Sequence, residues 1–296
     1  MSPDIRNTPL DWRASSPQKQ TLLASLLGFG YAFLDNRLMK YLQKHTEYYL
    51  VPAFLGAVLG LWYLVLKLTD FPPFILPAPP AVAKKFVKVI DNGELWKHIG
   101  VTFQEAGLGF IASMIMASIL GYILAKSKFL ERLVSPYLVA GQTVPLIALA
   151  PLLAVWLGYG MEAKIFIALV IVFFPMLVNV IIGIRLVSDD QRELMRSYST
   201  SPLQVFFLLE LPSALPVLLG ALKIGITVAI SGAMVGEYVS AHEGLGFMIL
   251  HAKQKFDTAQ VFVTIITLVI LNVSLYGIVT FLENVLLSGR KRGTSI

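Results

Sequence analysis

Residues 188–216 read SDDQRELMRSYSTSPLQVFFLLELPSALP, and the first half of this stretch is polar although long apolar runs lie on both sides of it. It contains two adjacent aspartates, two arginines and several serines and threonines before a proline-punctuated return to apolar residues. A polar segment of this length indicates a structured connection that stands outside a membrane. We refer to residues 188–212 as the polar insert.

The composition of the chain indicates a membrane protein. Of its 296 residues, 56% are hydrophobic and only 14% are charged, and the mean hydropathy is +0.72. A soluble domain has about 25% charged residues. The chain has no cysteine, which excludes disulfides and thiolate metal sites. Its net charge of +6 is spread between apolar segments, which argues against nucleic-acid binding and favours charge placement across a membrane.

Six apolar runs approach the length of about 20 residues that a helix needs to cross a bilayer. They lie at 48–68, 107–125, 135–157, 163–187, 213–239 and 259–287. The predicted fold class is therefore all-α, a polytopic membrane protein with six transmembrane helices. The shorter apolar stretch Thr21–Leu34 is predicted to lie at the membrane surface, and a seventh span is the alternative.

The distribution of Lys and Arg predicts the orientation. With six spans, the N-terminus, the loops that follow the second and fourth spans, and the C-terminus share one side and hold 15 of these residues, whereas the opposite side holds 7. Positive charge stays in the cytoplasm. We therefore expect a cytoplasmic N-terminal segment at 1–47, a transmembrane domain at 48–287 and a cytoplasmic tail at 288–296.

Acidic residues begin the polar insert. Asp189, Asp190 and Glu193 occupy positions where the first turn of a helix places negative charge against its own dipole. This predicts a helix that starts near residue 189 and stops between Ser197 and Ser199.

A second helix is predicted to follow. Thr200 or Ser201 can cap it, and Pro202 suits its first position because the missing N–H costs no hydrogen bond there. The helix carries an apolar run at 203–209, and Pro212 is expected to end it as the chain returns to the membrane. The polar insert is therefore predicted to be a helix–turn–helix whose apolar surface needs a partner; an ordinary solvated loop is the alternative.

The spacing of these residues resembles the EAA loop of ABC-importer permeases. In that family Glu-Ala-Ala is followed by three residues, a glycine, nine residues and Ile-x-Leu-Pro. Here Glu193, Leu211 and Pro212 match, and every interval fits. The departures are Leu194 and Met195 for the alanines, Ser199 for the glycine and Leu209 for the isoleucine.

The resemblance extends over roughly residues 70–287 and concerns the branch of permeases that imports nitrate, sulfonates, taurine and vitamin precursors. The matching segments are LPAP at 76–79, PLIALAP at 145–151, WLGYG at 156–160, FP at 174–175 with Asn179, GIR at 183–185 and GLG at 244–246. The resemblance implies the type I ABC-importer permease fold in the inner membrane of a bacterium.

The same resemblance implies partners. It implies that a cytoplasmic ABC ATPase subunit docks on the polar insert, with Glu193, Ser199, Phe206, Phe207, Leu211 and Pro212 as the coupling residues. It also implies an extracytoplasmic substrate-binding protein, a homodimer of permeases and surrounding membrane lipid. No cofactor is expected in this chain, because the partner ATPase binds ATP.

Polar and irregular features inside the apolar runs suggest a translocation pathway, since lipid tolerates them only where they face protein or water. The candidates are Gln142, Thr143, Pro145, Pro151 and Asn179. Kinks that serve packing alone are the alternative. Lys223 is expected to lie near the cytoplasmic surface or to pair with a carboxylate or carbonyl, and Glu237 is expected at the membrane interface.

No enzyme motif stands out. A Gly-rich phosphate loop and a HExxH metal motif are both missing, so the chain is not expected to be an enzyme. An ion-coupled secondary transporter is the rival class. It is disfavoured because six spans are few, and because the sequence shows no matched broken helices and no acids that we expect to be buried.

The substrate is expected to be a small organic nutrient. No arginine lies in the third span or the early fifth, and Arg185 stands only at the end of the fourth, so no site for a strong oxyanion is evident. Neutral amides and aromatic residues suit a flat, uncharged heterocycle better. The run QTVPLIALAP at 142–151 is also similar to permeases for riboflavin or for the pyrimidine precursor of thiamine. Riboflavin is therefore the first expectation, the pyrimidine the second, and taurine or an alkanesulfonate the third.

Overall fold

The computed structural model describes residues 46–240 and 242–287, and these residues form α-helices and one π-helical turn without any strand. The predicted all-α class is thus confirmed for them. The chain divides into two compact units, residues 1–69 and 70–296. The surface helix expected at Thr21–Leu34 and the tail at 288–296 lie outside the described residues.

The described part of the first unit is one helix, α3 (Thr46–Thr69). Its 24 residues extend over about 36 Å, enough to cross a hydrocarbon core. Apolar side chains such as Leu50, Phe54 and Leu68 are exposed along it. A helix with apolar residues on all sides suits a lipid environment. α3 therefore corresponds to the first predicted span at 48–68.

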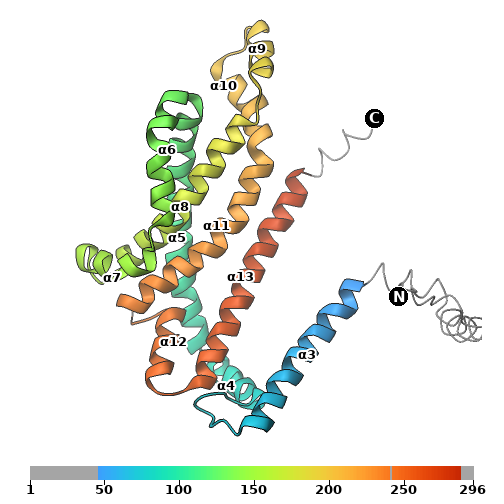
Figure 1. The fold of residues 1–296 in the computed structure, drawn as a ribbon, viewed down its shortest axis with the longest axis vertical. Helices are drawn as coiled ribbons and strands as arrows, with labels where there is room; N and C mark the ends of the chain where they lie inside the picture. The colour runs from blue at the N-terminus through green and yellow to red at the C-terminus, as the bar shows by residue number, and fades with distance from the viewer. Residues whose placement is uncertain (1–45, 241, 288–296) are drawn as a thin grey trace, which may run out of the picture. The chain divides into compact units, whose positions relative to one another are not determined.

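The centre of the second unit is formed by three long helices that pack together, α5 (Glu94–Lys126), α8 (Met161–Arg185) and α11 (Leu211–Ser240) (Figure 1). Small residues allow close approach. A Cβ added at Gly109 would lie 2.7 Å from the Ala168 Cβ, and one added at Gly232 would lie 2.8 Å from the Ala168 Cα. Membrane helices use such small-residue contacts because lipid provides no hydrophobic drive for association.

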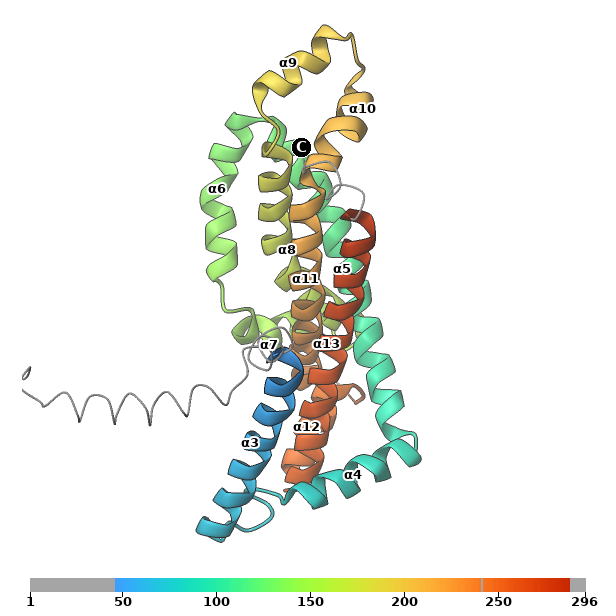
Figure 2. The same cartoon turned by 90° about the vertical axis from the view of Figure 1, so that its right-hand side faces the viewer.

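Shorter helices and the last span surround this centre (Figure 2). α13 (Thr258–Leu287) packs on α11, on α12 (Leu245–Gln254) and on α4 (Pro79–Asp91). Lys85 of α4 forms an ion pair with Asp257, which directly precedes α13. The short helix α4 is therefore tied to the beginning of the last span.

The third predicted span differs from the expectation. Instead of one helix over 135–157, the chain forms α6 (Lys128–Thr143) and α7 (Leu146–Leu157), whose axes are bent by 99°. The break follows from Pro145, because a residue before proline is forced out of the helical region, and Val144 has a ψ of 124°. Within the described residues, five helices are long and apolar enough to cross a membrane, or six when this bent pair counts as one span.

The polar insert contains α9 (Asp189–Ser197), α10 (Pro202–Val205) and a π-helical turn, η1 (Phe206–Glu210), which continues directly into α11. α9 and α10 project beyond the ends of α6 and α8 (Figures 1 and 2). The expectation that Pro212 ends the second helix is wrong. The wider π turn, in which the Leu211 N–H bonds to the Phe206 carbonyl, displaces the carbonyls that a proline ring would otherwise meet.

A buried ion pair joins two of the central helices. Lys164 Nζ of α8 lies 2.7 Å from Glu105 Oε1 of α5, and the two side chains are only 9% and 1% exposed. A charge inside a bundle is tolerated when an opposite charge and hydrogen bonds compensate for its lost hydration.

We predict that Lys164→Met lowers the free energy of unfolding by about 3–5 kcal/mol, because it leaves Glu105 buried without its cation. Thermal unfolding of the purified chain in detergent measures the change. Lys97→Met is the matched control: its ion pair with Glu243 is 62% and 44% exposed, so the loss should stay below about 1 kcal/mol. Equal effects of the two substitutions would contradict the structural role of the buried pair.

Candidate functional site

Helix α9 of the polar insert starts at a complete capping box. The Ser188 hydroxyl accepts from the Gln191 N–H at 3.3 Å, and the Gln191 side chain accepts from the Ser188 N–H at 3.1 Å. Asp189 and Asp190 follow in the first turn, where their negative charges interact favourably with the positive end of the helix dipole. The predicted start and end of this helix are confirmed.

The turn after α9 depends on Ser199. Its φ is +52°, in the left-handed region that favours glycine. The Ser199 N–H donates to the Arg196 carbonyl at 2.8 Å, and the Thr200 hydroxyl donates to the Met195 carbonyl at 2.7 Å. Serine therefore adopts the conformation for which the EAA pattern has glycine, and Thr200 helps to close the turn.

Helix α10 begins with a second capping box. The Ser201 hydroxyl accepts from the Gln204 N–H at 3.3 Å, and the Ser201 N–H donates to Gln204 Oε1 at 2.7 Å. Of the two predicted caps it is therefore Ser201 that caps the helix, with Pro202 at the first position. Two capped helices separated by one tight turn show that the polar insert is a structured helix–turn–helix.

The six predicted coupling residues divide into two groups. Glu193, Ser199 and Phe207 are exposed, whereas Phe206, Leu211 and Pro212 are half-buried toward the bundle. Leu203 and Leu208 add apolar surface, with 69% and 67% of their area exposed. The first group and these leucines are accessible to another protein, whereas Phe206 of the second group packs edge to face on Tyr122 of α5.

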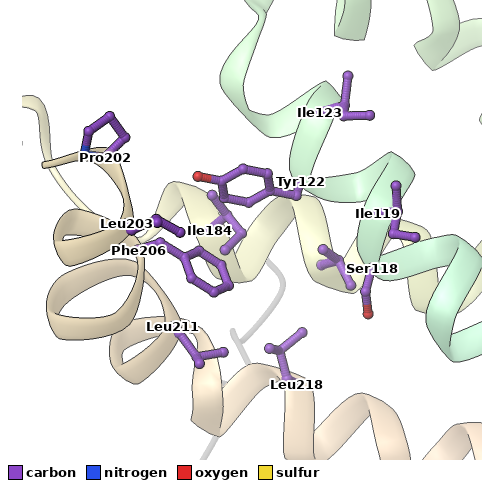
Figure 3. Close-up of a pocket in the computed structure, with 11 residues that line it drawn as sticks. Ser118, Ile119, Tyr122, Ile123, Ile184, Pro202, Leu203, Phe206, Leu211 and Leu218 are labelled. Atoms are coloured by element: carbon purple, nitrogen blue, oxygen red, sulfur yellow. The ribbon is translucent and has the colours of Figure 1, made fainter.

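An apolar cavity of about 510 Å³ lies where the polar insert meets the bundle (Figure 3). The rings of Tyr122 and Phe206 lie edge to face, with centroids 5.3 Å apart. The other lining residues come from α5, α8, α10 and α11 and are Ser118, Ile119, Ile123, Val180, Ile184, Pro202, Leu203, Leu211 and Leu218. The polar insert and the ends of these helices are thus not tightly packed against each other.

Beside this cavity lies an ionic cluster that the sequence did not reveal. Glu210, at the end of η1, is fully buried and forms an ion pair with Lys126 of α5. Arg192 of α9 lies 3.3 Å from the same carboxylate, and the Tyr122 hydroxyl lies 3.2 Å from it. The available signal was a lone glutamate in the apolar run FFLLELP.

The predicted pathway residues do not gather in one cavity. Gln142 and Pro145 line a cavity of about 390 Å³ together with Phe174 and Pro175. Asn179 donates to the Pro175 carbonyl at 2.8 Å and lines a separate cavity of about 20 Å³. Pro175 lines both cavities, so Gln142 and Asn179 lie on two sides of it.

The remaining two pathway candidates lie outside both cavities. Thr143 is exposed, and its hydroxyl donates to the Ala140 carbonyl at 2.8 Å within its own helix. Pro151 is exposed in the middle of α7 and does not interrupt it.

Glu237 is buried between helices near the end of α11. Its carboxylate accepts from the Thr102 hydroxyl at 2.6 Å and from the Gly246 N–H at 2.5 Å. Thr102 in turn accepts from the Leu245 N–H, and His98 Nδ1 accepts from the Gly244 N–H. This network fixes the connection between α11 and α12.

The expectation of no buried acids is also wrong. Glu105, Glu210 and Glu237 are each no more than 1% exposed. Their lack of solvent is compensated by cations, hydroxyls and backbone N–H groups, which the sequence could not place. Lys223 was expected to lie near the cytoplasmic surface or to pair with a carboxylate or carbonyl, and it pairs with the carboxylate of Glu283 of α13.

Apolar spanning helices, a broken span and a projecting helix–turn–helix define a multi-pass membrane transport protein. The chain belongs to the family of binding-protein-dependent transport system inner membrane components, which matches residues 108–286. It is therefore the permease subunit of a bacterial ABC importer and not an enzyme. This role implies an ATPase and a substrate-binding protein as partners.

Similar proteins support this assignment. The riboflavin transport system permease protein of Chloroflexus aurantiacus is 37% identical over 80% of this chain and 88% of its own length. The formylaminopyrimidine transport permease protein of Halalkalibacterium halodurans is 33% identical over 74% and 88%. A solved inward-facing structure of the methionine ABC transporter MetNI has a TM-score of 0.54 at 22% identity, covering 65% of this chain and 94% of that one, and shares the fold.

We predict that Ser199→Gly stabilises the end of α9. The left-handed conformation costs a residue with a Cβ about 1–2 kcal/mol, and glycine has no Cβ. Hydrogen exchange of the α9 amides, measured by mass spectrometry, should slow about fivefold for a gain of about 1 kcal/mol. Ser197→Gly is the matched control, since Ser197 is helical and donates to the Glu193 carbonyl; exchange should become faster. Acceleration in both variants would contradict the role of the turn.

Proposed function

We propose that this permease imports riboflavin. The observation that carries the proposal is the lining of the cavity of about 390 Å³, which contains one amide, one aromatic ring and apolar residues but no charged side chain. Its residues are Gly141, Gln142, Val144, Pro145, Ile147, Val170, Ile171, Phe174 and Pro175. Such a wall can hydrogen-bond and stack a flat heterocycle. The identity of 37% to a riboflavin permease supports the same substrate.

The pyrimidine precursor of thiamine is the second candidate. It is also a flat heterocycle, and a formylaminopyrimidine permease is 33% identical to this chain. Taurine or an alkanesulfonate is the third candidate. A permanent oxyanion is best held by a cation, and the cavity lining lacks one. Ion-coupled secondary transport remains the contrasting mechanism, in which uptake would follow an ion gradient instead of ATP.

The polar insert is proposed as the dock for the ATPase. Exposed Glu193, Phe207 and Leu208 offer a carboxylate and apolar surface on a capped helix–turn–helix, which suits a groove in a soluble partner. ATP binds to that partner, so no cofactor is proposed in this chain. The ATPase would then shift the permease between outward-open and inward-open states.

The same proposal sets the orientation and the assembly. The side with 15 Lys and Arg residues, which carries both termini and the polar insert, is assigned to the cytoplasm. A homodimer is proposed because six spans enclose too little to line a pathway alone. In such a dimer two identical inserts meet two identical ATPase subunits under twofold symmetry.

We predict that proteoliposomes with this chain as the sole permease, its ATPase and its binding protein take up labelled riboflavin when ATP is supplied. Gln142→Leu should lower this uptake about tenfold, the loss expected for a hydrogen bond of about 1.4 kcal/mol. Thr280→Val on α13, whose hydroxyl bonds within its own helix, should leave uptake unchanged.

Competition assigns the substrate in this assay. If the permease takes up formylaminopyrimidine or taurine and does not take up riboflavin, the assignment of riboflavin as the substrate is contradicted. Uptake that requires a second permease would contradict the homodimer, and uptake driven by an ion gradient without ATP would contradict the ATP-driven mechanism.

We predict that Glu193→Arg abolishes ATPase docking, because it replaces the exposed carboxylate in the middle of α9 by a cation. Binding of added ATPase is measured with inside-out membrane vesicles, and right-side-out vesicles should bind none. Glu162→Arg is the matched control, since Glu162 is exposed in the first turn of α8 at its other end. Normal docking to the Glu193 variant would contradict the assignment of the polar insert.

A further inference from the structure

Glu210 occupies a distinct position among the buried acids. Glu237 fixes the connection to α12, whereas Glu210 lies at the opposite end of the bundle, where the polar insert joins α11 (Figure 1). It is the last residue of η1, and its side chain has no exposed area. A carboxylate at such a place is stable only if its partners are fixed around it.

The partners of Glu210 come from separate structural elements. Lys126 and Tyr122 belong to α5, and Arg192 belongs to α9 of the polar insert. Arg192 also donates to the Ile184 carbonyl near the end of α8 at 3.1 Å. One carboxylate and one guanidinium therefore connect the polar insert to α5, α8 and α11.

The π turn places Glu210 inside the bundle. A π turn holds more residues than an α-helical turn, so it changes which side of the helix the following residues face. Phe207 and Leu208 are exposed, whereas Glu210, two residues after Leu208, is fully buried. The same short segment thus presents apolar surface outward and an acid inward.

The contacts of Glu210 differ in their solvent exposure. The Lys126 side chain is 36% exposed and that of Arg192 is 20% exposed, while Glu210 between them is inaccessible. Charge-assisted hydrogen bonds to a buried group are strong and directional. In contrast, the neighbouring cavity of about 510 Å³ interrupts the apolar packing of the polar insert on α5, which includes the ring contact of Phe206 with Tyr122. The ionic contacts are therefore the firm connection at this junction.

We propose that Glu210 is a positioning residue that transmits movement of the polar insert to α5 and α11. This inference rests on the proposed role of the polar insert as the ATPase dock. A displacement of α9 acts on Arg192, and Glu210 passes it to Lys126 and to the start of α11. Without the carboxylate, α9 moves and α5 does not follow.

The test is an accessibility measurement on the permease–ATPase complex. The chain has no cysteine, so Gln104→Cys on α5, an exposed position outside the cavity beside the polar insert, provides a single reactive site that reports movement of α5 itself. In the otherwise unaltered complex, ATP with vanadate should change the rate of maleimide labelling at least threefold. Glu210→Gln, which keeps the volume but removes the charge, should abolish this change while ATPase docking and ATP hydrolysis persist.

Glu283→Gln is the matched control. Glu283 also pairs with a lysine between two spans, Lys223 of α11, but it does not contact the polar insert. The ATP-dependent change in labelling should persist in this variant. Loss of the change in both variants, or its absence in the unaltered complex, would overturn the inference.

Arg192→Gln tests the same connection without altering the buried residue. It should abolish the labelling change as Glu210→Gln does, because both substitutions break the same connection. Persistence of the labelling change in the Arg192 variant would overturn the inference. ATPase docking is measured separately. A Glu210 variant that docks normally and keeps the labelling change refutes transmission through Glu210 but leaves the proposed dock intact. Normal docking of Glu193→Arg refutes the dock itself.

Discussion

Membrane lipid offers no hydrogen-bond partner, and this constraint determines how the bundle treats every polar group that enters it. The backbone solves the problem by forming helices throughout the described residues. The charged side chains solve it in pairs: Lys164 with Glu105, Lys223 with Glu283 and Lys126 with Glu210. Each pair joins two different helices or segments. The groups that would be most costly alone therefore become the contacts that hold the spans together.

The polar insert is shaped by the change of solvent at the membrane surface. Outside the membrane its helices are capped by Ser188 and Ser201, since water and side chains can satisfy helix ends there. At its return the chain does not stop and restart, because an unsatisfied helix end inside the bundle would be costly. Instead η1 carries the helix from α10 through Pro212 into α11. The continuous helix joins α10 to α11, whereas α9 lies beyond a turn and contacts this helix through the Arg192–Glu210 pair.

The two larger cavities have different surroundings and suit different tasks. The cavity at the polar insert is lined by parts of four α-helices and of η1 and lies next to the Glu210 cluster. The cavity beside the break between α6 and α7 contains Gln142 and Phe174 and lacks charge. Under the function proposed above, such a neutral wall would bind riboflavin weakly, which suits a permease that must release its substrate after each cycle. Loose packing at the first site and neutral polarity at the second are both compatible with movement.

The sequence by itself determined the class, five of the spans, the capped helix–turn–helix and the family, because apolar run length, helix caps and motif spacing are local properties. It also indicated that Lys223 needs a partner. The tertiary structure alone decided the 99° break at Pro145, the continuation through Pro212, and the burial of Glu105, Glu210 and Glu237. Proline can kink, break or be accommodated according to the turn before it. Whether a glutamate is exposed or buried depends on cations more than 50 residues away in the chain, such as Lys164 for Glu105 and Lys126 for Glu210, and only the packed helices bring these groups together.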